Sequence, residues 1–325
     1  MPLKIQQNIP LAKYTTFKIG GPAKYFCVVK NTDEIKEVLE FAESNKLKVF
    51  ILGSGSNLLV SDNGFNGLVI RIMNNELRIM NNEVFVGSGF SLAKLVLESV
   101  KADLTGLEWS TGIPGTIGGA VCNNAGAHGK CIGDVVEEVE TLEVAQKSST
   151  VPKRKPWGQH IFTNKQCQFS YRNSIFKKEK RHVILNVVLK LKKGNQKESR
   201  KIISEYLKLR ADKQPLKYNS AGSVFKNPRI SEERLKKIFS EYPKLKIIAK
   251  DNTVPAGWFI ETLKLKGKKI GRAIVSEKHG NFIVNTGNAK AEDVVILISL
   301  IKQKVRDNFG IQLNEEIEYV GFGTY

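Results

Sequence analysis

A glycine-rich stretch of eighteen residues, 112–129, constrains the fold of this chain more than any other feature. Six of these residues are glycine, yet Ile113, Ile117 and Val121 recur at a spacing that suits a helix. Glycines let the backbone adopt positive φ and bring bare N–H groups close to a ligand. The stretch therefore predicts a partly helical turn that binds a phosphate or pyrophosphate through main-chain donors.

A second glycine loop, residues 53–57, follows the apolar run at 49–52. Two such loops suggest one large diphosphate ligand held from two sides, although each loop alone is equally compatible with a tight turn in an ordinary α+β domain. The candidate ligand-binding residues of the two loops are Gly53, Ser54, Gly55, Ser56, Asn57, Gly112, Ile113, Pro114, Gly115, Thr116, Gly118, Gly119, Asn124, Ala125 and Gly126.

The spacing of these glycines excludes two common phosphate-binding classes. Leu58 stands where a dinucleotide-binding fingerprint requires its third glycine. Gly129 and Lys130 are followed by Cys131 and lack the upstream glycine of a P-loop. The chain is therefore expected to be neither a Rossmann dehydrogenase nor a P-loop enzyme.

Length and composition indicate a globular protein of two or three domains. The chain has 325 residues, of which 41% are hydrophobic and 26% charged. No apolar run approaches the length of a membrane span, and the N-terminal residues lack the apolar core of a signal peptide. We expect a cytoplasmic protein with no membrane insertion.

The formal net charge of +19 raises nucleic acid as a partner. The basic residues are scattered, however, with local clusters at 177–181, 190–193 and 264–269, and no nucleic-acid fold signature accompanies them. We expect solvated basic faces, helped by anionic small-molecule ligands, and no nucleic-acid partner.

Cysteine and histidine spacing predicts no structural metal. The four cysteines form no Cys-x-x-Cys pair, and the four histidines form no metal-ligand cluster. Reduced thiols are expected, and a disulfide between Cys122 and Cys131 is disfavoured.

Hydrophobic periodicity predicts alternating helices and strands along the chain. The expected helices are 34–46, 92–102, 198–209, 256–263 and 291–309. The expected strands are 48–52, 68–72, 84–87, 135–144, 183–191, 223–226, 282–285 and 311–320. In the last strand, alternation places Ile311, Leu313, Ile317 and Tyr319 on one face. Residues 146–160 are an expected exposed connection, and Pro215 marks an expected domain boundary.

Seven motifs, taken in order, resemble the UDP-N-acetylenolpyruvoylglucosamine reductase family. They extend from residue 14 to residue 321, almost the whole chain, and lie at 14–23, 53–58, 112–129, 171–174, 220–228, 279–285 and 313–321. One such motif would be a weak signal, but this many in the family's order is specific.

The resemblance implies an α+β fold with a two-part FAD-binding domain of the vanillyl-alcohol oxidase type over residues 1–212. Its subdomains would cover about 1–70 and 71–212. A substrate-binding α+β domain would follow at 213–325, with its C-terminal strand returning toward the flavin. Both glycine loops would line the pyrophosphate of non-covalent FAD, and His128 would line the pocket without tethering the flavin. The short spacing from Arg172 to Ser223 resembles the family's shorter type, which lacks a tyrosine-loop insertion.

The implied activity is NADPH-dependent, FAD-mediated reduction of UDP-N-acetylglucosamine-enolpyruvate to UDP-N-acetylmuramate, a step in peptidoglycan precursor synthesis. No obligate protein partner is evident. Two alternatives stay open: another FAD-dependent oxidase or dehydrogenase of the same superfamily, acting on a small alcohol or 2-hydroxy acid, and a non-enzymatic nucleotide-binding protein.

The resemblance implies three catalytic residues. Arg172 would stabilise the growing carboxylate charge, Ser223 would donate a proton to C2, and Glu316 matches the family's catalytic glutamate. The residues around Glu316 depart from the family pattern at Asn314 and Glu318, so Glu315 and Glu318 stay alternative candidates.

Four further residues are implied at the substrate and NADPH sites. Lysine ammonium and amide groups suit diphosphate oxygens. The candidates are Tyr171, Lys213, Lys226 and Asn227.

Overall fold

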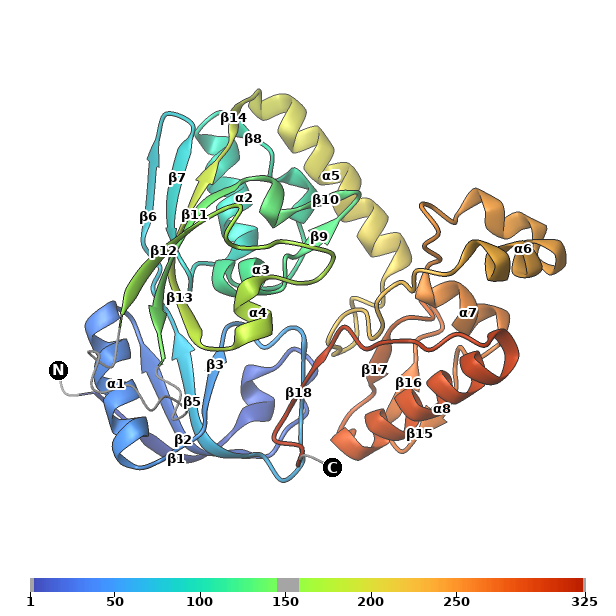
Figure 1. The fold of residues 1–325 in the computed structure, drawn as a ribbon, viewed down its shortest axis with the longest axis horizontal. Coiled ribbons are helices and arrows are strands. Elements are labelled where there is room, and N and C mark those ends of the chain that lie inside the picture. Colours follow the sequence, from blue (N-terminus) through green and yellow to red (C-terminus); the bar gives the residue numbers. More distant parts are fainter. Residues whose placement is uncertain (1–2, 145–157, 324–325) are drawn as a thin grey trace. The chain divides into compact units, whose positions relative to one another are not determined.

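The computed structural model describes residues 3–144 and 158–323 (Figure 1). The chain divides into two compact units, which are described separately. The first unit comprises Met1–Ile9, Ala23–Ser54 and Asn66–Arg210, and the second comprises Pro10–Pro22, Gly55–Phe65 and Ala211–Tyr325. Within the described ranges, none of the helices has the length and apolarity that a membrane span requires.

The smaller sheet of the first unit has the strand order β1-β2-β5-β3. Its strands are β1 Gln6–Pro10, β2 Pro22–Val29, β5 Phe65–Ile72 and β3 Val49–Leu52. Helix α1, Thr32–Ser44, begins where the Asn31 side chain accepts a hydrogen bond from the Glu34 N–H at 2.9 Å. Its buried face, with Ile35 and Val38, packs into the same hydrophobic cluster as strands β2 and β5.

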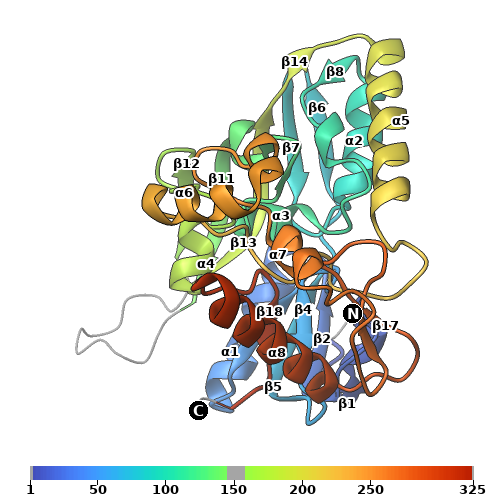
Figure 2. The ribbon, with the colours of Figure 1, turned by 90° about the vertical axis from the view of Figure 1, so that its right-hand side faces the viewer.

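The larger sheet of the first unit is antiparallel, with the order β12-β11-β13-β7-β6. Its strands are β12 Gln159–Thr163, β11 Val136–Glu143, β13 His182–Lys190, β7 Glu83–Gly87 and β6 Leu77–Met80. Helices α2, Leu92–Lys101, and α5, Gln196–Lys213, lie side by side in both ribbon views (Figures 1 and 2). They share one core with strands β7, β11 and β13 around the buried Trp109.

The second unit places helices against a three-stranded antiparallel sheet. The sheet has the order β15-β16-β17, with bounds Lys269–Ile270, Ala273–Val275 and Ile283–Asn285. The helices are α6 Glu232–Glu241, α7 Ala256–Thr262 and α8 Ala291–Phe309. Phe225 and Phe259 are fully buried in the core of this unit.

Two N-terminal segments belong to the second unit. Strand β4, Leu58–Val60, pairs in parallel with β18, Glu318–Val320, near the C-terminus. The Thr16 N–H donates to the Gly55 carbonyl at 3.1 Å, and the Thr16 hydroxyl donates to the Ser220 carbonyl at 2.7 Å. The second unit is therefore discontinuous in sequence, whereas the sequence-based division into 1–212 and 213–325 assigned these segments to the first domain.

Several expected elements are confirmed. Helix α8 has the predicted bounds, and Gly310 ends it in the left-handed conformation with φ 63°. Helices α2 and α7 and strands β3, β7, β11, β13 and β17 lie within one or two residues of their predicted positions. The predicted helices 34–46 and 198–209 correspond to α1 and to the longer α5.

The predicted strands at 223–226 and 311–320 are wrong as continuous strands. Ser223 and Phe225 form only isolated bridges, because the segment bonds to side chains as well as to neighbouring backbone. Only 318–320 of the last segment is a strand, and Tyr319 is 36% exposed while Val320 is buried. A bend at Ile317 breaks the alternation between these residues.

Two other expectations need adjustment. The predicted connection 146–160 lies outside the described residues up to 157, and Gln159 and His160 already belong to β12. Helical structure in the glycine-rich stretch is limited to α3, Ile117–Cys122, so Ile113 lies before the helix. The Thr116 side chain caps α3 by accepting from the Gly119 N–H at 3.3 Å.

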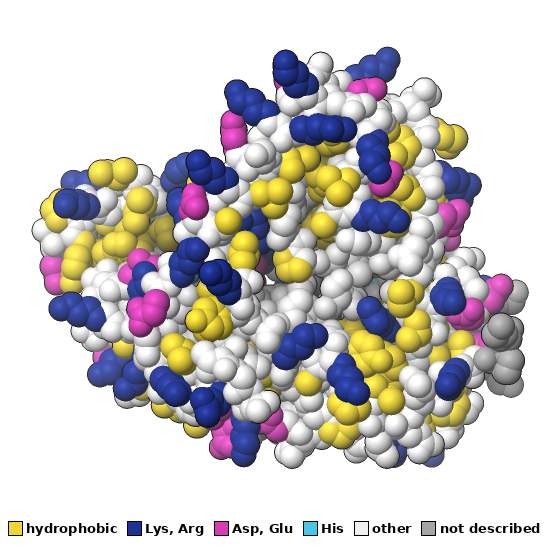
Figure 3. All heavy atoms as spheres, turned by 180° about the vertical axis from the view of Figure 1, so that it is seen from behind, with side chains coloured by type: hydrophobic (Ala, Val, Ile, Leu, Met, Phe, Trp, Pro, Cys, Tyr) yellow, Lys and Arg dark blue, Asp and Glu magenta, His cyan; other side chains and the backbone are white. Residues whose placement is uncertain are grey.

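Basic side chains are dispersed over the face seen in Figure 3, with hydrophobic and neutral side chains between them. This distribution fits the expectation that the charge of +19 is spread over solvated faces.

Candidate functional site

The first glycine loop offers main-chain donors. Among the described residues, no acceptor is hydrogen-bonded to the N–H groups of Gly53, Ser54, Gly55 or Asn57. Gly55 has φ 62°, and a Cβ there would lie 2.2 Å from the Tyr14 carbonyl oxygen, so only glycine fits. Successive unpaired N–H groups beside a left-handed residue form a concavity that binds anions. The loop therefore fits a pyrophosphate.

In the second glycine segment, unlike the first, the N–H groups at the start of helix α3 are already hydrogen-bonded. The Gly118 N–H donates to the Ser88 carbonyl at 2.8 Å, and the Gly119 N–H is used by the Thr116 cap. A Cβ on Gly53 would lie 2.6 Å from Thr116 Oγ1, so the two glycine segments meet within the first unit. A Cβ on Gly119 would have only Thr116 Oγ1, at 3.5 Å, within 4 Å. The second segment therefore places a backbone region without side chains, at Gly119, near Gly53. Most N–H groups of this segment are already hydrogen-bonded within the protein.

Arg172 lies at the tip of a tight turn in the first unit. Ser170 and Asn173 exchange two backbone hydrogen bonds, of 3.1 and 3.0 Å, and Arg172 between them has φ 55°. A non-glycine residue in this conformation costs about 1–2 kcal/mol and persists where its surroundings hold it. The Arg172 guanidinium donates to the Gly126 carbonyl at 2.7 Å.

Further bonds attach this turn to the glycine-rich segment. Asn124, which is buried, donates to the Ser170 carbonyl at 2.9 Å and accepts from the Gly133 N–H at 3.0 Å. The Ser174 hydroxyl donates to the Cys122 carbonyl at 2.6 Å. The structure therefore brings together Arg172 and the candidates Asn124, Ala125 and Gly126, and gives the Asn124 side chain a structural task.

Ser223 is half-buried in an extended segment of the second unit. Among the described residues, none forms a hydrogen bond to its hydroxyl, so the hydroxyl is not used to stabilise the local backbone. Asn281 holds the segment instead: its side chain accepts from the Phe225 N–H at 2.9 Å and donates to the Phe225 carbonyl at 2.8 Å. The Asn281 carbonyl also accepts from the Val224 N–H at 2.8 Å.

Glu316 lies beside the Ser223 segment. Its N–H donates to the carbonyl of Val224, the residue after Ser223, at 2.7 Å. Its own carbonyl accepts from the Asn57 side chain at 3.0 Å. The second unit thus brings together Ser223, Glu316 and the end of the first glycine loop.

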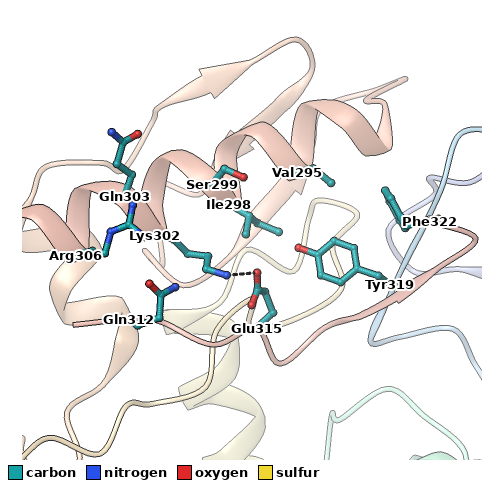
Figure 4. Close-up of a pocket in the computed structure, with 10 residues that line it drawn as sticks. All are labelled: Val295, Ile298, Ser299, Lys302, Gln303, Arg306, Gln312, Glu315, Tyr319 and Phe322. Carbon is teal, nitrogen blue, oxygen red and sulfur yellow. Dashed lines mark hydrogen bonds and ion pairs between the residues drawn. The ribbon is translucent and has the colours of Figure 1, made fainter. Parts of the chain in front are cut away.

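The two alternative carboxylates are placed differently from Glu316. Glu315 forms an ion pair with Lys302 of α8 at 2.8 Å (Figure 4). Glu318 lies in β18, where its N–H donates to the Asn57 carbonyl at 2.8 Å. Glu315 also forms a β-bridge with Phe225. Because adjacent side chains point to opposite faces in such extended backbone, we expect Glu316 on the face opposite to Glu315.

The candidate substrate-binding residues are divided between the two units. Tyr171, in the first unit, is 55% exposed, and its ring lies 5.4 Å from the Arg172 guanidinium carbon. Lys213 is exposed at the end of α5, and Lys226 is half-buried after the Ser223 segment. The Asn227 side chain accepts from the Ala256 N–H at 3.0 Å, so it helps to begin helix α7.

His279, in the second unit, is affected by the charges of Lys266 and Lys213. Burial lowers its pKa below the usual 6.5, the Glu261 carboxylate opposes that shift, and the Lys266 and Lys213 charges add to it. Its ring nitrogen Nδ1 accepts from the Asn281 N–H at 3.1 Å, which requires the neutral form of the ring. His128, in contrast, stacks on Tyr206 at 4.1 Å between ring centroids.

Sequence reasoning did not single out three residues that the structure makes important: Asn281, Lys302 and Glu108. Buried Glu108 accepts from the Ser199 hydroxyl at 2.6 Å, the Thr105 hydroxyl at 2.7 Å and the Gly106 N–H at 2.8 Å. Burial raises the pKa of Glu108, but these hydrogen bonds outweigh it and lower the pKa overall. Their partners in the structure reveal these roles; Asn281 lies in the motif at 279–285, but the motif does not show which groups it bonds to.

In the part of the chain that the structure describes, the cysteines, histidines and carboxylates form no candidate metal site. No group of three or more His, Cys, Asp or Glu side chains there could hold a metal ion. The four cysteines are unbridged, and burial raises the pKa of Cys27 to about 11 and that of Cys167 to about 12. The two buried thiols are therefore unreactive at neutral pH.

Comparison with known families shows that this chain is an FAD-containing oxidoreductase. Residues 23–151 match the family model described as "FAD binding domain". Residues 214–320 match the model described as "UDP-N-acetylenolpyruvoylglucosamine reductase, C-terminal domain". The predicted fold class, an α+β FAD-binding region with an α+β substrate domain, is confirmed.

Whole-chain relatives identify the family within this class. The UDP-N-acetylenolpyruvoylglucosamine reductase of Caldanaerobacter subterraneus subsp. tengcongensis is 38% identical, covering 98% of this chain and 94% of the relative. The reductase of the same name from Bacillus pumilus is 35% identical, with 98% and 94% covered. A crystal structure of the reductase from Thermus caldophilus matches with TM-score 0.74 and 32% identity, covering 98% of this chain and 99% of that one. The chain belongs to the UDP-N-acetylenolpyruvoylglucosamine reductase family.

Proposed function

We propose that this flavoenzyme reduces UDP-N-acetylglucosamine-enolpyruvate to UDP-N-acetylmuramate with NADPH, and that Arg172, Ser223 and Glu316 carry the chemistry. Because the chain belongs to this family, we no longer retain the two alternative interpretations, another FAD-dependent oxidase or dehydrogenase and a non-enzymatic nucleotide-binding protein. The observation that carries the residue assignment is the Ser223 segment: a half-buried hydroxyl without a hydrogen-bonded neighbour among the described residues, one residue from the backbone contact with Glu316.

When bound, FAD would supply the hydride-transfer chemistry between NADPH and C3 of the enolpyruvyl double bond. The residues of the first glycine loop hold its pyrophosphate, with Gly53, Ser54, Gly55 and Asn57 offering N–H donors. Five positions of the second segment carry no side chain: Gly112, Gly115, Gly118, Gly119 and Gly126. The proposed binding loops are completed by Ile113, Pro114, Thr116, Ser56, Asn124 and Ala125.

Ser223 supplies the proton that C2 of the substrate needs after hydride addition to C3. A hydroxyl is a weak acid, so it can donate only to a strongly basic carbon, such as one bearing enolate character. Since no described residue competes for a hydrogen bond, the hydroxyl proton is available for this transfer. NADPH, a proton and the enolpyruvyl ether thereby give NADP⁺ and the saturated lactyl ether.

Arg172 and Glu316 complete the proposed catalytic set. The permanently charged guanidinium stabilises the carboxylate as negative charge builds on it, and its bond to the Gly126 carbonyl orients it beforehand. Glu316 serves as the catalytic glutamate because Glu315 is engaged by Lys302. Arg172 belongs to the first unit, and Ser223 and Glu316 belong to the second.

Substrate and NADPH binding fall to Tyr171, Lys213, Lys226 and Asn227. The two lysines offer charge to diphosphate or NADPH phosphate oxygens. The side-chain oxygen of Asn227 accepts from the Ala256 N–H at the start of α7. We assign residues 1–212 mainly to FAD binding and 213–325 to substrate binding, and we place the reaction in the cytoplasm.

A three-step colour test examines the proposed function. The purified protein should be yellow, bleach on addition of NADPH, and regain its colour when UDP-N-acetylglucosamine-enolpyruvate is added without oxygen. We call the bleaching step the NADPH half-reaction and the recovery the substrate half-reaction. A folded protein that binds FAD and bleaches, but recovers only with a small alcohol's oxidised product, would overturn the proposal.

A further inference from the structure

We propose that Lys302 is a positioning residue for the substrate half-reaction, because its ion pair with Glu315 sets the orientation of the segment that presents Glu316. This inference rests on the proposed function of Glu316. Lys302 itself lies on helix α8 and has no catalytic task.

The ion pair is partly shielded from solvent. Lys302 Nζ lies 2.8 Å from Glu315 Oε1, and the two side chains are 28% and 22% exposed. Partial burial lowers the effective dielectric constant, so this pair is stronger than a fully exposed one. Helix α8 provides a fixed base for Lys302, since the neighbouring Ile301 and Ile298 are buried in the core of the second unit.

The ion pair spans a hollow. A cavity of about 490 Å³ lies between α8 and the C-terminal segment, and the residues that line it include Val295, Ile298, Tyr319 and Phe322 (Figure 4). In Figure 4, Lys302 extends from the helix toward Glu315 along this cavity. Backbone hydrogen bonds hold this segment on the side of Val224 and Asn57, and a side-chain contact across the cavity would fix it on the other side. The ion pair supplies such a contact next to Glu316.

The backbone transmits this constraint to Glu316 over one residue. Glu315 forms a bridge with Phe225, and the next N–H, that of Glu316, bonds to the Val224 carbonyl at 2.7 Å. In an extended backbone the side chains of Glu315 and Glu316 point to opposite faces. A hold on Glu315 from the α8 side therefore directs Glu316 to the other side, and a rotation of the segment would move both carboxylates together.

The test compares Lys302→Met with Lys302→Arg and with Lys304→Met, a matched control at an exposed position two residues along the same helix. Misplacement of a catalytic group by about 1 Å can cost on the order of 100-fold in rate. Lys302→Met should slow the substrate half-reaction by about 10- to 100-fold through kcat, with little change in KM. The NADPH half-reaction should be unchanged, and Lys302→Arg should restore most of the rate.

A double-mutant cycle separates positioning from a general structural role. In a Glu316→Gln background, Lys302→Met should slow the substrate half-reaction further by less than about two-fold, because both changes remove the same contribution. The charge exchange Lys302→Glu with Glu315→Lys should recover part of the rate lost in either single variant.

Two outcomes would overturn the inference. One is a Lys302→Met enzyme as fast as Lys304→Met in the substrate half-reaction. The other is a loss that multiplies fully with that of Glu316→Gln, or falls equally on both half-reactions. In each case a wild-type enzyme that turns over UDP-N-acetylglucosamine-enolpyruvate leaves the proposed function intact. A wild type without this turnover contradicts the proposed function and the inference together.

Discussion

The turn that carries Arg172 and the segment that carries Ser223 hold their candidate catalytic groups in different ways. The Arg172 guanidinium is anchored to the Gly126 carbonyl, and its backbone is held in a left-handed conformation. Around Ser223, in contrast, Asn281 and Glu316 bond to the neighbouring backbone, while no described residue bonds to the serine hydroxyl. A permanent charge benefits from fixed orientation, whereas a proton donor must keep its proton free for the substrate.

The largest effect is expected from Ser223→Ala. General acid catalysis contributes on the order of 10²- to 10⁴-fold, so the substrate half-reaction should slow by that factor. The NADPH half-reaction should keep the wild-type rate, because no described residue relies on the hydroxyl to hold the fold. Stopped-flow absorbance of the flavin measures both steps, and Ser240→Ala on α6 is the matched control. Equal slowing of both half-reactions would make Ser223 a structural residue.

Arg172→Ala should have the next largest effect. Loss of one preorganised donor to a developing negative charge costs on the order of 10²- to 10³-fold. The loss should fall on the substrate half-reaction, and the exposed Arg200→Ala should behave as wild type in the same stopped-flow experiment. Normal substrate turnover by Arg172→Ala would remove this residue from the mechanism and with it the proposed difference between the two regions.

Asn281→Ala tests how the Ser223 segment is held. The substitution leaves the buried N–H and C=O of Phe225 without their partners. Each unpaired group costs about 1–3 kcal/mol, so the free energy of unfolding should fall by about 2–6 kcal/mol for the two groups. Urea unfolding measures the change, with Asn308→Ala on the exposed side of α8 as the control. A loss no greater than the control's would mean that other contacts hold the segment.

The smallest effect is a pH dependence from His279. Its folded-state pKa is lowered by burial, so its contribution is fully present above the unfolded value of 6.5. That contribution is lost as the pH falls through the folded pKa, because the protonated ring no longer accepts from the Asn281 N–H. The free energy of unfolding of His279→Gln should fall less between neutral and acidic pH than that of wild type. An unchanged slope would exclude this residue; His182, whose pKa burial also lowers, leaves a residual slope in either case.

Local sequence predicted the elements whose stability is local. Helix α8 is set by its apolar periodicity and by Gly310, and both signals lie within the helix or directly after it. The resemblance of seven motifs placed Ser223, Glu316 and the glycine loops among the functional segments. The amino-acid sequence alone is therefore sufficient to place the C-terminal helix, whereas the site residues that the resemblance implies stay predictions.

Long-range contacts explain what the sequence did not predict. Pairing of β4 with β18 joins residues 58–60 to 318–320, and no local pattern announces it. The same holds for Asn281, whose partners are 56 residues away in sequence, and for Lys302, which engages Glu315 across a cavity. The alternation at 311–320 failed because tertiary contacts bend the chain at Ile317, which overrides the local period.

Single-turnover recovery of the substrate half-reaction in Ser223→Cys, measured beside Ser223→Ala, tests the central claim most directly. A thiol has nearly the same position as the hydroxyl and a more acidic proton, so a proton donor at this site should regain part of its function. The account predicts that Ser223→Cys recovers faster than Ser223→Ala while both bleach with NADPH like wild type. A Ser223→Cys enzyme as slow as Ser223→Ala, or a Ser223→Ala enzyme as fast as wild type, would contradict it.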